Sequence, residues 1–292
     1  MRGLIILVGI AASLSSVCAI PVTTLDIRAD HESIFNLTND FDCKSDKNPV
    51  VMIHGLSANR NFDLNFLEAW LRPQGYCTYG LTYGEYPELP SVGGLRSIAE
   101  TSQEIVDFIN EVLKKTGAKK VDLVGHSEGG LQALYVAKVR KMSPKIDKIV
   151  GIASATHGSD VDSLVTLFKA LGLRPGLDDL LKNFGCAACL DVLPDGGPVQ
   201  ALQDGPIVQP GNKVTMIATK HDEAVTPAGK ASFINEPGVY NVYTQDPCPI
   251  DFSGHITIAL DKNMFNMALN ALQDKNGRAF ECTIFSGLGL KR

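Results

Sequence analysis

Residues 121–130 read VDLVGHSEGG, a short apolar run followed by a Gly-x-Ser-x-Gly motif. The run 121–124 has the composition of a buried strand, and residues 129–141 have helical character. A serine between such a strand and such a helix stands on a tight turn, which leaves little room two positions to either side. Gly125 and Gly129 occupy those positions. The stretch therefore predicts a nucleophile elbow with Ser127 at its tip; the alternative is an ordinary glycine-rich turn.

Strands and helices alternate on both sides of this motif. The sequence predicts further strands at residues 50–53, 76–83, 146–153, 214–219 and 239–244, and further helices at 97–116 and 256–272. Ser97 and Glu100 are expected to form a capping box at the start of the helix 97–116, and Gly117 is expected to end it. Strands that alternate with helices favour a parallel sheet covered on both faces. The predicted fold class is α/β, a single doubly wound, mostly parallel sheet.

The N-terminal residues have the features of a secretory signal. Arg2 precedes an apolar run at residues 3–12, which is too short to span a bilayer, and Val17-Cys18-Ala19 is a small-residue cleavage site. We expect a signal peptide at 1–19, with a buried N-terminal helix as the alternative, and a single secreted domain at 20–292. No later segment has the length and apolarity of a transmembrane helix.

Composition narrows the class of partner. The formal net charge is −5, so nucleic acid is not an expected partner, and 45% hydrophobic residues exclude a disordered chain. Of seven cysteines, the six beyond Cys18 suggest disulfides in an oxidising compartment. Asn36-Leu37-Thr38 is a candidate glycosylation site. The sequence leaves the oligomeric state open.

A nucleophilic serine needs a base and an acid that orients the base. His255 opens the last predicted helix, where the chain order Ser…Asp…His places the base. His126 is set aside because its side chain should point away from that of its neighbour Ser127. Asp222 follows the strand 214–219 directly and is the expected acid. Three other acidic residues compete with it: Glu223, Asp246 and Asp251.

The tetrahedral intermediate of such a reaction needs two backbone N–H donors. One is expected at Glu128, the residue after the serine. The other is expected from the loop that follows strand 50–53, where Leu56 is the preferred donor and Gly55 lets the chain approach the site.

With these residues in place, the chain resembles the secreted class 2 lipases, α/β-hydrolases of actinobacterial and fungal type. The resemblance runs from about Phe41 to Cys282 and rests on seven segments: 48–56, 75–77, 81–84, 125–130, 186–191, 222–227 and 245–249. It implies hydrolysis of carboxylic esters, usually acylglycerols, with no cofactor and no metal. It also implies the triad Ser127, Asp222 and His255. Glu128 departs from the family pattern, in which Gln is more usual.

The resemblance also selects the disulfides, because spacing alone leaves the pairing open. It implies the pairs Cys43–Cys77, Cys186–Cys189 and Cys248–Cys282. A rival zinc or redox site at Cys186-x-x-Cys189 is weak, since no second ligand pair lies near it in the sequence.

Residues 158–212 are too long for a plain connection between two strands. They carry apolar stripes at helical spacing and predict a helical cap over the carboxyl ends of the strands, with Val165 and Phe168 facing the bound acyl chain. The alternative is an excursion packed on the flank of the domain.

The predicted function is therefore a secreted lipase or esterase that forms an acyl-enzyme on Ser127 and acts on lipid esters, in solution or at a lipid interface. An acyltransferase or a soluble-ester or polyester esterase would use the same triad. A catalytically silent binding protein on the same scaffold is the rival from another class.

Overall fold

The computed structural model describes residues 37–160, 162–163 and 185–284. Its sheet is parallel and has the strand order β2-β1-β3-β4-β5-β6. The strands are β1 (Val50–Ile53), β2 (Thr78–Gly80), β3 (Val121–His126), β4 (Ile146–Ile152), β5 (Lys213–Ala218) and β6 (Tyr240–Tyr243). The chain steps from β1 outward to β2 and then returns to β3 on the other side of β1. The direction of winding therefore changes between β1 and β3, and the predicted doubly wound α/β fold is confirmed.

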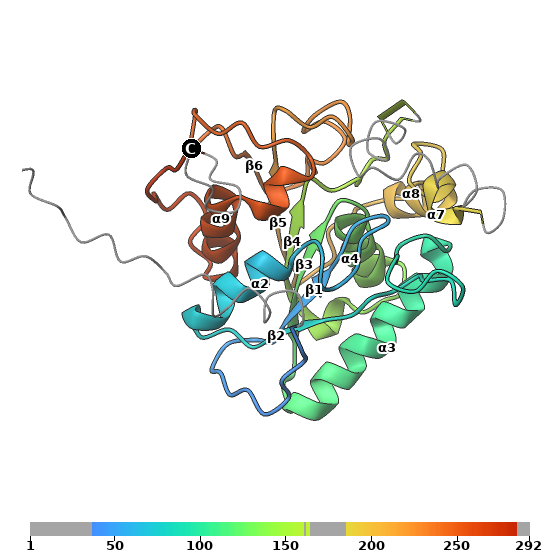
Figure 1. The fold of residues 1–292 in the computed structure, drawn as a ribbon, viewed down its shortest axis with the longest axis horizontal. Helices are drawn as coiled ribbons and strands as arrows, with labels where there is room; N and C mark the ends of the chain where they lie inside the picture. The colour runs from blue at the N-terminus through green and yellow to red at the C-terminus, as the bar shows by residue number, and fades with distance from the viewer. Residues whose placement is uncertain (1–36, 161, 164–184, 285–292) are drawn as a thin grey trace, which may run out of the picture.

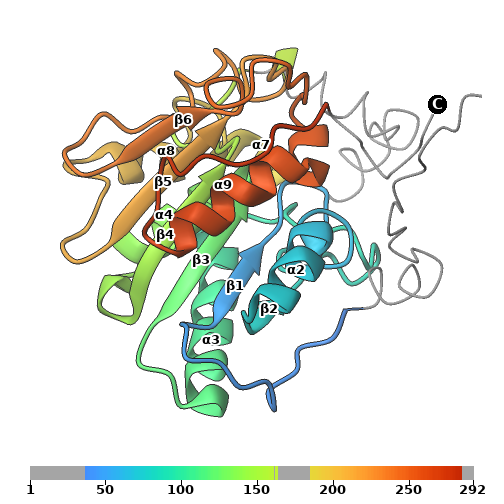
Figure 2. The ribbon, with the colours of Figure 1, turned by 90° about the vertical axis from the view of Figure 1, so that its left-hand side faces the viewer.

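Helices cover both faces of the sheet (Figure 1). The helices α2 (Asn65–Leu71) and α9 (Lys262–Leu272) lie on one face, in front of the sheet in Figure 2. The other face carries α3 (Ile98–Thr116), α4 (Glu128–Lys138), α7 (Ala187–Asp191) and α8 (Gly197–Gln203). The described residues also form three short 3₁₀ turns: η1 (Arg72–Gln74), η2 (Ser143–Lys145) and η3 (Thr257–Leu260).

The first strand shows how the sequence produces these layers. Successive side chains of a strand point to opposite faces of the sheet. Val50 and Met52 join the core beneath α2 and α9, whereas Val51 and Ile53 join the core beneath α3 and α4. All four side chains are buried, which explains the uninterrupted apolar run.

Two predicted elements differ markedly from the observed ones, and one observed helix was not predicted. The strand predicted at 76–83 is paired only at Thr78–Gly80. The helix predicted at 256–272 is divided into η3 and α9 at Asp261, whose side chain accepts a hydrogen bond from Asn263 N–H and begins the second helix. Helix α2 has no counterpart among the predicted elements.

The predicted capping box of α3 is wrong. Asp191 Oδ2, from α7, accepts the Ile98 N–H at 2.8 Å and the Ser97 hydroxyl at 3.0 Å. Glu100 turns to Arg96 instead, with 3.4 Å between their charged groups. A carboxylate from a distant element therefore takes the place of the local cap, where the helix N-terminus favours negative charge.

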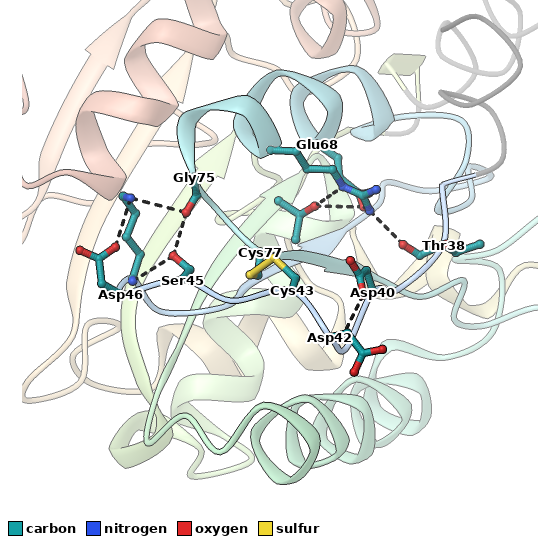
Figure 3. The surroundings of a disulfide bond; sticks show 12 residues. Thr38, Asp40, Asp42, Cys43, Ser45, Asp46, Glu68, Gly75 and Cys77 are labelled. Carbon is teal, nitrogen blue, oxygen red and sulfur yellow. Dashed lines mark hydrogen bonds and ion pairs between the residues drawn. A yellow bond between two sulfur atoms is a disulfide. The ribbon is translucent and has the colours of Figure 1, made fainter.

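Disulfides join Cys43 to Cys77, Cys186 to Cys189 and Cys248 to Cys282. The first ties the segment before β1 to the start of β2 (Figure 3). Beside it, the Ser45 hydroxyl donates to the Gly75 carbonyl at 2.7 Å. The side chain of Asn39 bonds both the N–H and the C=O of Gly80, so it covers the free edge of β2.

In the described part of segment 158–212, Ser159 and Val192 line a small cavity beside Ser127. Helix α7 packs against α3, and α8 packs against α4. Val165 and Phe168 lie outside the described residues, as do Asn36 and the predicted signal peptide 1–19. Among the helices that the structure describes, none combines the length and apolarity of a membrane span.

Candidate active site

Ser127 lies at the junction of β3 and α4 in a conformation that L-residues rarely adopt, with φ 56° and ψ −122°. The flanking glycines allow this turn. A Cβ atom on Gly125 would collide with the carbonyl of Gly129, and a Cβ on Gly129 would collide with the carbonyl of Ile53. The backbone is therefore folded tightly around Ser127, as in a nucleophile elbow.

The structure brings Ser127, His255 and Asp222 together from three loops. The distance from Ser127 Oγ to His255 Nε2 is 2.9 Å. On the other side of the ring, His255 Nδ1 lies 3.0 and 3.1 Å from the two carboxylate oxygens of Asp222. All three residues are buried. This arrangement fixes the ring with Nδ1–H toward the acid and the Nε2 lone pair toward the serine hydroxyl.

Asp222 is held in its ionised form. Burial alone would raise its pKa, but the charge and hydrogen bond of His255 oppose that effect. The backbone N–H groups of Ala224 and Val225 donate to Oδ1 at 3.0 and 2.7 Å. The net result is a pKa below the usual value of an aspartate.

The three competing carboxylates have other partners. Glu223 Oε2 accepts the main-chain N–H of His255 at 2.9 Å. Asp246 bonds Lys220 at 3.2 Å. Asp251 accepts the main-chain N–H of Ser253 at 2.8 Å and the side-chain amide of Asn263 at 3.1 Å. Of the four acidic candidates, Asp222 is the one that contacts the imidazole ring.

Two amides are available for an oxyanion. The Gly55 N–H is occupied, because it donates to Asp63 Oδ2 at 2.7 Å. Within the described ranges, neither the Leu56 N–H nor the Glu128 N–H has a main-chain acceptor. Leu56, Glu128 and Ser127 line the same small cavity. The two amides thus lie beside the serine, as an oxyanion hole requires.

The side chain of Glu128 is buried. One carboxyl oxygen lies 3.2 Å from the Tyr83 hydroxyl and 3.4 Å from the side-chain amide of Gln132. Burial raises the pKa of Glu128 to about 8, so the carboxyl carries a proton at neutral pH.

A second, larger cavity of about 210 Å³ opens beside Ser127 and His255. It lies between the loop that leads into α2 and the η3 turn, and its apolar lining includes Leu56, Ala58, Phe62, Phe66, Ile256 and Leu260. Within the described residues, segment 158–212 supplies none of this lining, whereas Ser159 and Val192 reach the small cavity. The predicted substrate contacts of Val165 and Phe168 stay predictions.

Sequence reasoning missed Asp63. Asp63 Oδ1 lies 2.8 Å from Nδ1 of His126, the histidine that the sequence analysis set aside. No local motif marks this pair, because the two residues come from different loops. Cys186 and Cys189 are joined to each other, which leaves no free thiolate there for the zinc or redox alternative.

The fold and the arrangement at its strand ends define the chain as an α/β-hydrolase. Lipase B of Aspergillus fumigatus has a similar fold, with a TM-score of 0.63 and 17% identity over 82% of this chain and 55% of that one. The mature lipase BlEst2 of Bacillus licheniformis gives a TM-score of 0.53 and 16% identity, over 79% of this chain and 93% of that one.

The family described as lipase (class 2) matches residues 47–256, and the chain belongs to this family. Similar curated proteins are the triacylglycerol lipases of Pseudarthrobacter phenanthrenivorans and Burkholderia plantarii. Each is 32% identical over an alignment of 129 residues that covers 40% of this chain and 36% or 32% of the relative, respectively. The chain thus aligns with about a third of each curated relative. The predicted family is confirmed.

Proposed function

We propose that the protein hydrolyses carboxylic esters of lipids through an acyl-enzyme on Ser127. The observation that carries the proposal is the chain of contacts from Ser127 Oγ to His255 Nε2 and from His255 Nδ1 to Asp222. A serine hydroxyl is a weak nucleophile at neutral pH, and a base within hydrogen-bond reach activates it.

The reaction has two halves. Ser127 Oγ attacks the ester carbonyl carbon while its proton passes to His255 Nε2. The carbonyl oxygen becomes negative and accepts hydrogen bonds from the Leu56 and Glu128 N–H groups. The intermediate collapses, the C–O bond to the alcohol breaks, and His255 returns the proton to the departing alcohol. Water then attacks the acyl-enzyme with His255 as base, and the carboxylic acid leaves as Ser127 regains its proton.

The apolar cavity beside Ser127 and His255 supports a lipid substrate, because its lining suits a hydrocarbon chain better than a polar group. The relatives named triacylglycerol lipases support the same class. The three disulfides and the signal-like residues 1–19 support secretion. Rates on esters of increasing acyl length, measured below and above their solubility limits, separate a lipase from a soluble-ester esterase.

The variant Ser127→Ala tests the mechanism. It should remove turnover of a short-chain p-nitrophenyl ester while far-ultraviolet circular dichroism stays unchanged, because only a hydroxyl is lost. A residual enhancement of about 10³–10⁴ over water is expected from the rest of the site. Activity within about tenfold of wild type would exclude Ser127 as the nucleophile.

A further inference from the structure

A second carboxylate–histidine pair lies directly beside the first. Asp63 Oδ1 is 2.8 Å from His126 Nδ1, and both side chains are buried. On the far side of the ring, His126 Nε2 is 3.0 Å from the main-chain carbonyl oxygen of His255. The rings of His126 and His255 have their centroids 5.0 Å apart.

Both partners of His126 are hydrogen-bond acceptors. A carboxylate oxygen faces Nδ1 and a carbonyl oxygen faces Nε2, so both contacts are hydrogen bonds only when both ring nitrogens carry protons. His54 provides a contrast within the same site. Its Nδ1–H donates to the Gly55 carbonyl and its Nε2 accepts the Tyr83 N–H, which is the pattern of a neutral ring.

The charged groups around His126 favour the protonated ring. Burial opposes the charge, but Asp63 from the loop before α2, the His255 carbonyl and Asp222 from the loop after β5 all favour it. The net effect raises the pKa of His126 above its usual value of 6.5. Asp63 responds in the opposite direction: burial raises its pKa, but His126 and the Gly55 N–H outweigh burial and lower it.

We propose that His126, as an imidazolium held by Asp63, is a positioning residue that fixes the main chain of the catalytic base and links it to the oxyanion loop. The inference rests on the proposed function of Ser127 and His255. Asp63 uses its second oxygen, Oδ2, to hold the Gly55 N–H, immediately before the proposed donor Leu56. One carboxylate therefore connects both halves of the catalytic machinery.

The main chain of His255 is held from two sides. Glu223 Oε2 accepts its N–H at 2.9 Å, and His126 donates to its carbonyl. When His126 loses a proton, the ring keeps Nδ1–H toward the Asp63 carboxylate, the stronger acceptor, and Nε2 presents a lone pair to the His255 carbonyl. The base is then no longer anchored at its carbonyl, which lowers kcat more than it weakens substrate binding.

The variant Asp63→Asn tests this role. An amide has one acceptor oxygen, so Asn cannot accept hydrogen bonds on both sides as the two carboxylate oxygens of Asp63 do. With a short-chain p-nitrophenyl ester we expect kcat to fall about 10- to 100-fold with little change in KM. The alkaline limb of the kcat profile should move to lower pH, because His126 loses the charge that raises its pKa. A purely structural defect would lower the amount of active enzyme without moving this limb.

Asp122→Asn is the matched control. Asp122 is also buried and lies in β3, but it bonds Asn48 and the Lys148 N–H near the amino end of the strand, away from Ser127. Its replacement should alter stability and leave the pH profile of kcat in place.

A measurement on the wild-type protein keeps the test independent of folding. In a ¹⁵N-histidine spectrum at pH 7, assigned with His126→Gln, both ring nitrogens of His126 should be protonated, with a titration midpoint above 6.5. A neutral His126 ring at pH 7, or a normal kcat and pH profile in Asp63→Asn, would overturn the inference. Ser127→Ala in the same assay separates the two proposals. If the inference is overturned but Ser127→Ala is inactive, the proposed function stands and only the positioning role of His126 fails. If Ser127→Ala is active, the proposed function itself fails.

Discussion

Ser127, His255 and Asp222 show how far single residues are predictable. Each follows a strand. The expected chain order places the acid between Ser127 and His255, where all four acidic candidates lie, and the position directly after the strand 214–219 favours Asp222 among them. The structure places that carboxylate on the ring of His255. Asp63 was not predicted, because it lies far from His126 in the sequence and the two residues meet only in the folded chain.

The role of Asp222 is testable by Asp222→Asn. The substitution preserves the shape but presents the wrong hydrogen-bonding group to His255 Nδ1, so kcat should fall about 10⁴-fold. Steady-state kinetics on a short-chain ester measure the effect. Asp246→Asn is the control, since its carboxylate bonds Lys220 and should cost far less. A crippling Asp246→Asn with a mild Asp222→Asn would place the acid elsewhere.

Glu128 makes stability depend on pH. In the unfolded chain this carboxyl ionises near 4.5, whereas burial raises the pKa in the folded protein to about 8. The contribution of the protonated Glu128 carboxyl to the free energy of unfolding is fully present below pH 4.5. It is lost as pH rises toward 8, because the unfolded chain releases its proton at a lower pH than the folded protein does. Glu128→Gln removes this loss.

The free energy of unfolding of Glu128→Gln, relative to wild type, should therefore increase between pH 5 and pH 9. Each pKa unit corresponds to about 1.4 kcal/mol, so the expected increase is a few kcal/mol. Urea denaturation at both pH values measures it. Glu100→Gln, at an exposed carboxylate, should show no such change. A Glu128→Gln difference that is equal at the two pH values would contradict the protonated carboxyl.

At the scale of elements, strands buried on both faces of the sheet were recognisable in the sequence as short apolar runs. β1 has the predicted bounds, because its residues form an uninterrupted apolar run. The predicted strand 76–83 was too long, because only Thr78–Gly80 finds a partner in β1. The start of α3 was predicted with a local cap, although Asp191 supplies the acceptor from α7. The residues around the start of α3 do not indicate this contact with Asp191, which is distant in the sequence.

Asp191→Ala should lower the free energy of unfolding by about 0.5–2 kcal/mol, the usual cost of losing a helix cap. The Ile98 N–H would lose its acceptor at the start of α3. Thermal or urea denaturation measures the effect. Ser97→Ala should cost less, because the Asp191 carboxylate and its bond to Ile98 remain. A larger loss of unfolding free energy for Ser97→Ala than for Asp191→Ala would instead support the local capping box.

At the scale of the whole molecule, the sheet order places the site. The winding reverses between β1 and β3, and the loops that follow these two strands carry Leu56 and Ser127. Alternating strands and helices were enough to predict this architecture. The larger cavity was not predictable, because Phe62 and Ile256 approach each other only in the folded chain. The predicted cap at 158–212 remains a prediction.

The central claim is that Ser127 forms a covalent intermediate with ester substrates. Its most direct test is labelling with a fluorophosphonate, followed by intact-mass and peptide mass spectrometry beside the loss of ester hydrolysis. We predict one phosphonyl group per chain, located on Ser127, with inactivation proportional to labelling and no adduct on Ser127→Ala. An adduct on another residue that accounts for the inactivation, or full ester hydrolysis by Ser127→Ala, would contradict the claim.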